Sequence, residues 1–375
     1  MSNPAITDTF AFIIHPIDPK KDVSRKWPWL GRLLTPEQVD FFSLFFPPVY
    51  ISEITGIRSA STGRELRGWF VACPFTPQRM MTLPEARVYR KIIATGRLAE
   101  RLGARILGLG AYTSVVGDAG ITIARALDVP VTTGDAYTIA MAVEAVRRAA
   151  AIMGIGLGQA HAAVVGATGA IGQVCAELLA GDVARLTLVS RRPDALAALQ
   201  ERCAAAGSAE LITSTDPASI YDADLVLTVT SAITAVIEPE HLKPGAVVCD
   251  VARPRDVSRR VGEQRDDVLV IEGGMVEVPG DVDFHFDFGF PPRMAYACMA
   301  ETMALALEGR YEDYSLGKQI SRARVEEISA IAARHGFRLG PFRSFERGPV
   351  TPETIARVQE RAASERRRWS PRHGR

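Results

Sequence analysis

The chain has 375 residues, of which 47% are hydrophobic and 23% are charged. This profile is typical of a folded globular protein of roughly two domains and excludes a mainly disordered or fibrous chain. The formal net charge of +1 excludes a global field that would hold the protein to nucleic acid or to an anionic membrane. The five cysteines form no C-x-x-C pair, so they indicate neither a disulfide framework nor a zinc site and favour a reducing cytoplasm.

The N-terminal residues lack the basic and apolar segments of a secretory signal, so we expect a cytoplasmic protein. The most apolar short run is 41–46 (FFSLFF), and it ends at Pro47. It is far shorter than the ~20 residues that span a bilayer as a helix. We therefore expect no integral membrane segment and interpret the run as core or as the lining of an apolar channel.

The first part of the chain is predicted to be strand-like and then to alternate. Strands are expected at 10–14, 49–57 and 66–72, with a turn at 61–63. A helix is predicted from Pro84 to Gly103, because apolar residues then recur at helical spacing. Strands at 105–109 and 130–133 follow, with helices at 118–127 and 136–153. This alternation predicts a parallel sheet covered by helices.

A second alternating block follows the glycine-rich segment 154–158. Strands are expected at 162–165, 186–190, 225–229, 246–250 and 268–271, and helices at 171–179 and 193–205. Later helices are predicted at about 291–307, 323–335 and 351–361. The predicted fold class is α/β, with a Rossmann-like doubly wound domain at 156–290 and an N-terminal α/β substrate domain at 1–155. Residues 291–375 are expected to form a helix with the candidate nucleophile and a C-terminal helical tail.

A glycine-rich turn joins the first strand and helix of the second block. Its G-x-x-G-x-x-G pattern allows a tight turn, a close approach of the main chain to a pyrophosphate, and packing of the helix on the strand. The helix N-terminus adds free N–H donors and a positive dipole end. The alternative is a glycine turn without a ligand. The candidate cofactor-binding residues of this turn are Gly166, Thr168, Gly169, Ala170, Ile171 and Gly172.

The next strand ends in a serine and two arginines, Ser190, Arg191 and Arg192. Guanidinium groups suit the extra phosphate of NADP, whereas a carboxylate here would suit NAD. We therefore predict NADPH as the cofactor, with a solvated arginine pair as the alternative. Thr230 and Ser231 follow the predicted strand at 225–229 and are further candidate contacts of the cofactor.

The cysteines differ in their predicted surroundings. Cys175 and Cys203 fall on helices and are expected to be small buried apolar groups. Cys249 ends a strand at the edge where ligands collect in doubly wound folds, and Cys73 closes an early strand. Cys298 is expected in the second turn of a helix that follows a glycine- and aromatic-rich loop, where flanking alanines leave room for an acyl group.

Several segments between about Gly63 and Phe337 resemble, in the same order, the long-chain acyl-[acyl-carrier-protein] reductases best known from cyanobacteria, which form fatty aldehydes. In that family a cysteine accepts the acyl group as a thioester, so the resemblance implies this role for Cys298 and NADPH binding by the glycine turn. It also implies a long-chain acyl thioester as substrate and acyl carrier protein as partner. The matching segments are 110–120 (GAYTSVVGDAG), 131–138 (VTTGDAYT), 165–172 (VGATGAIG), 273–280 (GGMVEVPG) and 297–302 (ACMAET).

Proton transfer and acyl binding have candidate residues outside the cysteine. His285 and Glu301 are candidates to serve the leaving thiolate or the oxyanion, although a lone histidine is more often structural. The 41–46 run and four alternating phenylalanines are candidates for the lining of an acyl tunnel, with core packing as the alternative. These four are Phe284, Phe286, Phe288 and Phe290.

Three other interpretations stay open at this point. One is a shikimate-dehydrogenase-like NADP oxidoreductase without covalent catalysis, and another is a glutamyl-tRNA-reductase-like enzyme that uses Cys73. The third is a non-catalytic NADPH-binding protein. The basic tail at 361–375 either docks an acidic carrier protein or is solvated. The acyl donor is acyl carrier protein or, as the alternative, coenzyme A. The sequence makes no prediction of the chain length of the substrate or of the oligomeric state.

Overall fold

A computed structural model describes residues 8–345 and 348–369 of the chain. They form two compact units. Unit 1 comprises Met1–Thr138 and Val276–Gly340, and unit 2 comprises Ile139–Met275 and Pro341–Arg375. The chain thus returns to unit 1 after the second sheet, because strand β13 and helix α12 complete the first sheet and its cover. This division differs from three consecutive domains bounded at 155 and 290.

Unit 1 contains a mixed six-stranded sheet with the order β13-β2-β3-β1-β4-β5. Strands β3, β1, β4 and β5 run parallel, whereas β2 and β13 pair in antiparallel fashion at one edge. The predicted strands of the first region are therefore confirmed. The bounds are β1 (Thr9–Ile14), β2 (Val49–Arg58), β3 (Glu65–Ala72), β4 (Leu107–Leu109), β5 (Val131–Thr132) and β13 (Gly280–Asp283).

Two helices cover opposite faces of this sheet. Ala11 and Ile13 of β1 belong to a core cluster with Val88 and Ile92 of α5 (Glu85–Arg101). Alternate residues of a strand point to opposite faces, so Phe12 faces the other side. There Gly108 of β4 leaves space for both Phe12 and α12 (Ala297–Glu308), since a Cβ at this glycine would lie 2.4 Å from Phe12 and 2.2 Å from Thr302.

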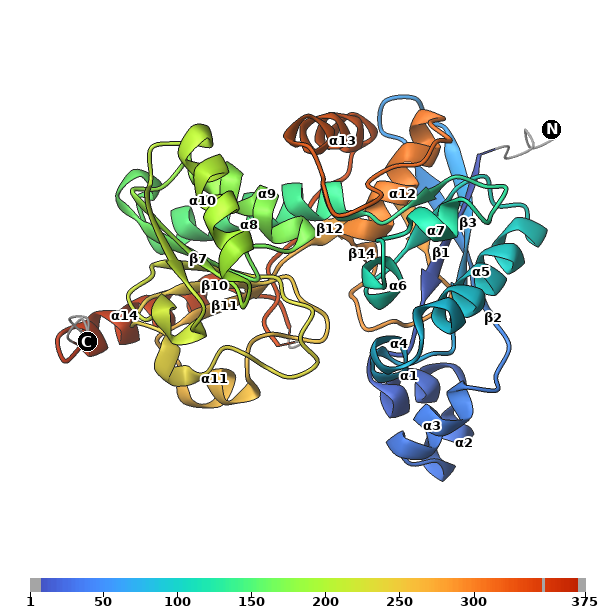
Figure 1. Ribbon diagram of the computed structural model, residues 1–375, viewed down its shortest axis with the longest axis horizontal. Helices are drawn as coiled ribbons and strands as arrows, with labels where there is room; N and C mark the ends of the chain where they lie inside the picture. The colour runs from blue at the N-terminus through green and yellow to red at the C-terminus, as the bar shows by residue number, and fades with distance from the viewer. Residues whose placement is uncertain (1–7, 346–347, 370–375) are drawn as a thin grey trace. The chain divides into compact units, whose positions relative to one another are not determined.

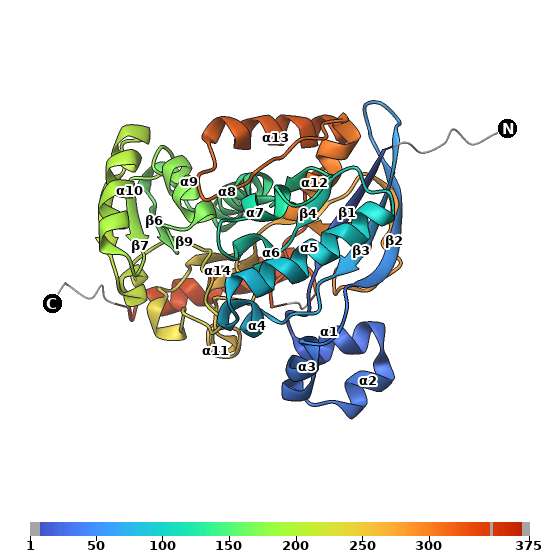
Figure 2. The same ribbon diagram turned by 45° about the vertical axis from the view of Figure 1, so that its right-hand side comes forward.

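Smaller elements complete unit 1. Four short helices before residue 83 were missed by the sequence analysis, because Pro19, Pro28, Pro36 and Pro77 start each one anew and few of their apolar residues face a core. They are α1 (Pro19–Lys26), α2 (Pro28–Leu33), α3 (Pro36–Ser43) and α4 (Pro77–Thr82), and the first three form a cluster in Figures 1 and 2. The others are α6 (Tyr112–Val115), α7 (Ile121–Ala124), α13 (Arg322–His335) and the small sheet of β12 (Met275–Glu277), β14 (Met294–Tyr296) and β15 (Arg338–Leu339).

Unit 2 contains an entirely parallel six-stranded sheet with the order β11-β10-β9-β6-β7-β8. This order is that of a doubly wound Rossmann sheet, so the predicted fold class is confirmed. The sequence analysis missed one edge strand, β8, whose residues are largely exposed and lack a buried apolar run. The strands are β6 (His161–Val165), β7 (Arg185–Val189), β8 (Glu210–Ser214), β9 (Leu225–Thr228), β10 (Val247–Asp250) and β11 (Leu269–Glu272).

In unit 2 the helices at 170–179, 193–206 and 352–366 match predicted helices, whereas the short helix at 259–264 was not predicted. Thr351 caps α14 and accepts a hydrogen bond from the Thr354 amide, with Pro352 at the first helical position. In the described part of the chain, no helix has both the length and the apolar composition to cross a bilayer. The helices are α9 (Ala170–Leu179), α10 (Pro193–Ala206), α11 (Arg259–Gln264) and α14 (Pro352–Arg366), while α8 (Asp135–Met153) begins in unit 1 and continues into unit 2.

Candidate active site

The glycine turn of unit 2 lies between β6 and α9, at the carboxyl edge of the parallel sheet. Gly166 has a φ of +85°, and a Cβ there would lie 2.6 Å from the Val229 carbonyl oxygen. A Cβ at Gly172 would lie 2.3 Å from the Gly166 oxygen, so both positions require glycine. Gly169 caps α9 without a side-chain hydrogen bond. The first amides of α9 are thus suited to a pyrophosphate, as predicted for Ala170 and Ile171.

Polar groups from two segments converge beside this turn. The Thr168 and Ser190 hydroxyls lie 2.5 Å apart, and the Arg192 guanidinium donates to the Thr168 carbonyl at 2.6 Å. Arg191 is exposed directly after Ser190. The residues that follow β7 therefore supply hydroxyl and guanidinium groups, which match the 2′-phosphate of NADP.

A buried carboxylate orders the loop after β9. Asp256 accepts hydrogen bonds from the Thr228 hydroxyl at 2.6 Å and from the Thr230 amide at 2.8 Å. Burial raises the pKa of Asp256, and these hydrogen bonds oppose that shift. Thr230 is thereby held at the carboxyl edge, and the exposed Ser231 follows it. A role of either residue in cofactor binding stays a prediction.

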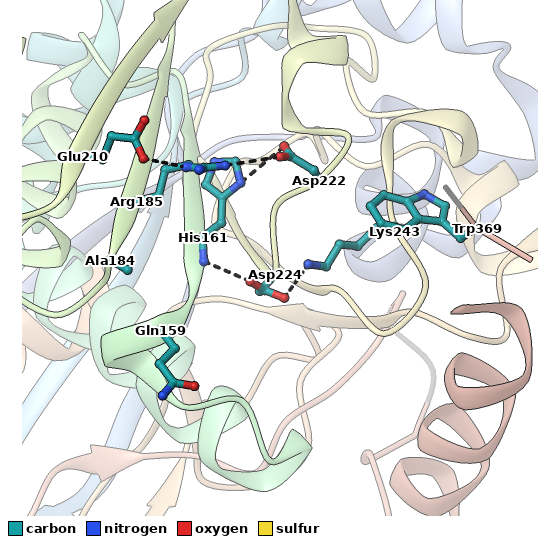
Figure 3. A pocket seen from close by; sticks show the side chains of 9 residues that line it. All are labelled: Gln159, His161, Ala184, Arg185, Glu210, Asp222, Asp224, Lys243 and Trp369. Carbon is teal, nitrogen blue, oxygen red and sulfur yellow. Dashed lines mark hydrogen bonds and ion pairs between the residues drawn. The ribbon is translucent and has the colours of Figure 1, made fainter. Parts of the chain in front are cut away.

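A polar pocket of unit 2 lies at the opposite, amino edge of the same sheet (Figure 3). Its volume is about 370 Å³. His161, Arg185 and Glu210 begin strands β6, β7 and β8 there. Arg185 pairs with Glu210 at 3.0 Å, and Lys243 pairs with Asp224 at 2.5 Å. The pocket is thus remote from the glycine turn. Its lining has three carboxylates, Glu210, Asp222 and Asp224, and two permanent cations, Arg185 and Lys243.

Cys298 lies in unit 1, at the second residue of α12. The prediction placed it in a second turn, but 291–293 are not helical and β14 precedes the helix, which begins only at Ala297. The shift puts the sulfur among the free amides of the first turn, where the positive end of the helix dipole is strongest. Of the five cysteines, only Cys298 is partly accessible, whereas Cys73, Cys175, Cys203 and Cys249 are buried.

Contacts to β5 and the loop after it define where α12 begins relative to the sheet. Glu301 accepts hydrogen bonds from the Thr132 hydroxyl of β5 and, at 2.8 Å, from the Tyr137 amide. Gly134, two residues beyond β5, has a φ of +76°, and a Cβ there would lie 2.3 Å from the Cα and Cβ of Cys298. The first turn of α12 therefore lies at the carboxyl edge of the unit 1 sheet.

Two acidic groups, Asp135 and Glu301, lie close enough to the Cys298 thiol to raise its pKa. Burial, and then the charge of Asp135, raise its pKa to about 12, while the amides of Met299 and Cys298 lower it. Burial and the neighbouring Glu301 raise the pKa of the Asp135 carboxyl to about 8. Asp135 therefore carries a proton through most of the neutral range and can exchange it there. The sequence analysis missed Asp135 because 163 residues separate it from Cys298.

The two predicted proton carriers have different surroundings. Glu301 is fully buried, and its hydrogen bonds hold the segment that contains Gly134 and Asp135. His285 is half-exposed and pairs with Asp283 at 3.4 Å. No described contact joins the His285 side chain to Cys298, and its role in proton transfer stays a prediction.

His15 is a second residue that the sequence analysis missed. It directly follows β1 at the same carboxyl edge, and its Nε2 accepts a hydrogen bond from the Tyr112 amide at 3.1 Å. Burial lowers its pKa to about 4, so the ring is neutral at physiological pH. An acceptor role for Nε2 puts the proton on Nδ1. A lone histidine next to proline gave no signal of this position in the sequence.

Aromatic rings form a path through unit 1 toward the start of α12. Phe284 stacks on Phe70 with centroids 5.7 Å apart, and Phe288 contacts Phe284 at 5.0 Å. Phe290 continues the path and lies 4.4 Å from the ring of Tyr296, which caps α12. Three of the four alternating phenylalanines, Phe284, Phe288 and Phe290, are therefore contiguous. In contrast, Phe41, Phe42, Phe45 and Phe46 are exposed and do not line a tunnel within the structure.

Fold and site together define an α/β NADP-dependent oxidoreductase. Residues 147–272 match the family model for shikimate / quinate 5-dehydrogenase. The chain is 31% identical over 336 residues to the long-chain acyl-[acyl-carrier-protein] reductase of Synechococcus elongatus, covering 86% of this chain and 95% of that protein. The chain belongs to this reductase family, and it binds NADPH.

Two further comparisons are less complete. The chain is 30% identical over 294 residues to aminotransferase PigE of a Serratia strain, which covers 76% of this chain. The match spans only 34% of PigE. Among solved structures, L-tryptophan dehydrogenase of Nostoc punctiforme covers 95% of this chain and 89% of its own, with 12% identity and a TM-score of 0.41.

Replacing Arg191 with alanine should raise the KM for NADPH by about ten- to a hundredfold and leave the KM for NADH almost unchanged. A charge-assisted hydrogen bond to the 2′-phosphate contributes about 1.5–3 kcal/mol, and NADH has no such phosphate. Steady-state kinetics with both cofactors measure the change. Arg202→Ala is the control, because this guanidinium of α10 pairs with Glu177 at 3.3 Å. Equal KM values for Arg191→Ala and the parent would identify Arg191 as a solvated surface residue.

Proposed function

We propose that the protein reduces a long-chain acyl thioester to a fatty aldehyde, with Cys298 as the group that holds the acyl chain. One observation carries the proposal. Cys298 is the only partly accessible cysteine, and it lies in the first turn of a helix at the carboxyl edge of the unit 1 sheet. All five thiols have raised pKa values, so accessibility, not acidity, distinguishes Cys298.

The chemistry proceeds in two transfers through one sulfur atom. The Cys298 sulfur attacks the acyl carbonyl carbon, a new carbon–sulfur bond forms, and the bond to the carrier's thiol breaks. NADPH, when bound, supplies a hydride. After the carbonyl carbon has been reduced, its bond to Cys298 breaks and releases the aldehyde and the free thiol. Covalent attachment keeps the acyl group in place between the two transfers.

We assign the proton transfer beside Cys298 to Asp135. A group with a pKa of about 8 is close to the pH at which an acid–base catalyst works best. Ionised Asp135 takes the proton of the Cys298 thiol when the sulfur attacks and gives it to the departing thiolate of the carrier. After the reduction, the departing Cys298 thiolate takes a second proton, which comes from water by way of Asp135. The amides of Met299 and Cys298, which lower the pKa of the thiol, also favour negative charge at the sulfur.

Replacing Asp135 with asparagine should have opposite effects on thiol reactivity and on turnover. Above pH 8 the ionised Asp135 of the parent opposes the Cys298 thiolate, so the variant should react faster with iodoacetamide there. Below pH 7 Asp135 is protonated, and the two proteins should react alike. Turnover should fall by about 10²–10⁴-fold, the usual loss when an acid–base group is removed. Asp128→Asn, at an exposed acid of unit 1, should change neither rate. Unchanged turnover in Asp135→Asn would exclude the proton transfer.

The aromatic path supports a long-chain substrate. Rings from Phe70 to Tyr296 form an apolar path that ends at the residue before α12. An acyl chain bound along this path would cover the rings and keep water from the thioester. Relatives of the same family suggest acyl carrier protein as the donor.

The described tail arginines make internal contacts, Arg361 with Asp266 at 3.2 Å and Arg366 with the Pro244 carbonyl at 3.1 Å. They hold Arg361 and Arg366 on unit 2, and docking of an acidic carrier by the tail stays a prediction. The five unpaired cysteines fit a reducing cytoplasm.

One observation favours a second candidate function. The match of 147–272 to the shikimate / quinate dehydrogenase model fits hydride transfer without covalent catalysis. Incubation with a long-chain acyl thioester in the absence of NADPH, followed by mass spectrometry of the peptides, distinguishes the two. An acyl adduct on Cys298 supports the thioester reductase, and an adduct on Cys73 supports the glutamyl-tRNA-reductase-like alternative. Full activity after alkylation of Cys298 supports the dehydrogenase.

A further inference from the structure

An unusual concentration of exposed apolar side chains lies on α2, α3 and the turn after α3. Six of the eleven exposed large hydrophobic residues in the described part of the chain fall between residues 29 and 46. We call them the apolar platform, and they are Trp29, Leu33, Phe41, Phe42, Phe45 and Phe46. Two of them, Leu33 and Phe45, are 72% and 69% exposed. Isolated exposed apolar residues are ordinary, but a cluster of this kind marks an interaction surface.

The four phenylalanines form one continuous face. Their spacing is i, i+1, i+4 and i+5, and the Phe45 amide donates to the Phe42 carbonyl at 2.9 Å, so the helical path extends past α3. The ring of Phe41 lies 5.5 Å from that of Phe42 and 5.7 Å from that of Phe45. Val39 and Ser43 of α3 are buried on the other side. Helix α3 thus packs on the rest of unit 1 through Val39 and Ser43, and the phenylalanine side chains stay exposed.

The packing of α3 shows that this face is held in place. Asp40 pairs with Arg79 of α4 at 2.7 Å and accepts a hydrogen bond from the Thr76 hydroxyl. The Phe46 carbonyl accepts a hydrogen bond from Lys91 of α5 at 2.7 Å. Close contact between α1 and α2 requires Gly31, where a Cβ would overlap the Ser24 hydroxyl. The exposed rings therefore belong to a folded surface.

The platform shares an edge of the unit 1 sheet with Cys298. Helix α1 begins four residues after His15, at the carboxyl end of β1, and α4 follows the carboxyl end of β3. Cys298 packs on Gly134, just beyond the carboxyl end of β5. Both features therefore lie on the side of the sheet where the parallel strands end.

We propose that the apolar platform docks on an anionic lipid bilayer. Phenylalanine, leucine and tryptophan suit the boundary between head groups and acyl chains. The exposed charged residues of the same three helices are Lys20, Lys21 and Arg32 against one acid, Glu37. The excess of basic side chains complements anionic head groups. The benefit of docking rests on the proposed function, because a water-insoluble aldehyde could then pass from the protein directly into lipid.

Sedimentation with vesicles tests the proposal without any substrate. The full-length protein should pellet with phosphatidylcholine vesicles that contain phosphatidylglycerol, and less with phosphatidylcholine alone. The double variant Leu33→Ser/Phe45→Ser should lower the partition coefficient at least about tenfold. Ile212→Ser, at an exposed apolar residue of β8, is the matched control and should bind as the parent does. Lys20→Gln/Lys21→Gln should remove the preference for anionic vesicles.

A second measurement tests whether Trp29 enters the lipid. Brominated phospholipids should quench part of the tryptophan fluorescence of the bound protein, and Trp29→Phe should remove this quenching while binding persists. The proposal is overturned if the parent stays in the supernatant with both kinds of vesicle, or if the double variant binds equally well. Self-association that the double variant abolishes, without vesicle binding, would instead identify an interface between copies of the chain.

Activity separates this proposal from the proposed function. With a short, water-soluble acyl thioester and no vesicles, Leu33→Ser/Phe45→Ser should reduce substrate at the rate of the parent. A protein that binds vesicles but reduces no thioester would contradict the proposed function and leave the docking intact. A protein that reduces the soluble thioester but does not bind vesicles would contradict the docking proposal and leave the proposed function intact.

Discussion

Cys298→Ser should abolish aldehyde formation, with a loss of at least about 10³-fold in turnover, because a serine hydroxyl in place of the thiol cannot replace the nucleophile that holds the acyl group. Acyl-adduct formation, measured by mass spectrometry without NADPH, should vanish with it. NADPH binding, measured by fluorescence, should persist because the glycine turn lies in the other compact unit. Stability should change little, since the substitution replaces one small side chain at a partly accessible position.

Cys73→Ser is the control for this experiment. Cys73 is fully buried after β3, and burial raises the pKa of its thiol to about 11. Its replacement should leave an acyl adduct on Cys298 and most of the turnover. If Cys298→Ser still carried an acyl group on another residue and turned over at the rate of the parent, the covalent scheme through Cys298 would be wrong.

Sequence patterns predicted correctly those parts of the fold that depend only on residues close together in the chain. The glycine turn needs only a buried strand, three spaced glycines and a helix, so 161–179 could be interpreted directly. The start of α12 could not, because 291–296 combine two prolines with three residues that pair as β14. Helices α1–α3 were missed for a related reason, since their apolar residues face outward and do not repeat at the period of a buried face.

The site around Cys298 shows where sequence reasoning ends. Cys298 itself was predicted, chiefly through the resemblance to a family. Gly134 and Asp135 were not, because their importance depends on β5 bringing them beside a helix that begins more than 160 residues later in the chain. Glu301 was predicted as a proton carrier, yet its hydrogen bonds to Thr132 and Tyr137 make it the residue that joins these two segments.

Gly134→Ala should disable the same site without touching a reactive group. A Cβ at this position would lie 2.3 Å from Cys298, so α12 or the loop must move. The positive φ of +76° adds backbone strain. We expect a loss of about 2–4 kcal/mol in the free energy of unfolding. The rate of acylation of Cys298 should fall about a hundredfold, because a displacement of about 1 Å is enough to misplace a nucleophile.

The variant Gly154→Ala is the control that separates the effect of backbone strain at a positive φ from the effect of steric overlap with Cys298. Gly154 has a φ of +73°, almost that of Gly134, but a Cβ there would meet nothing within 4 Å. Its replacement should cost about 1 kcal/mol in the free energy of unfolding and leave acylation unchanged. Denaturant titration and the time course of acyl-adduct formation measure both effects. If Gly134→Ala and Gly154→Ala acylated Cys298 at the same rate, close packing of the β5 loop on the sulfur-bearing turn would not position the nucleophile.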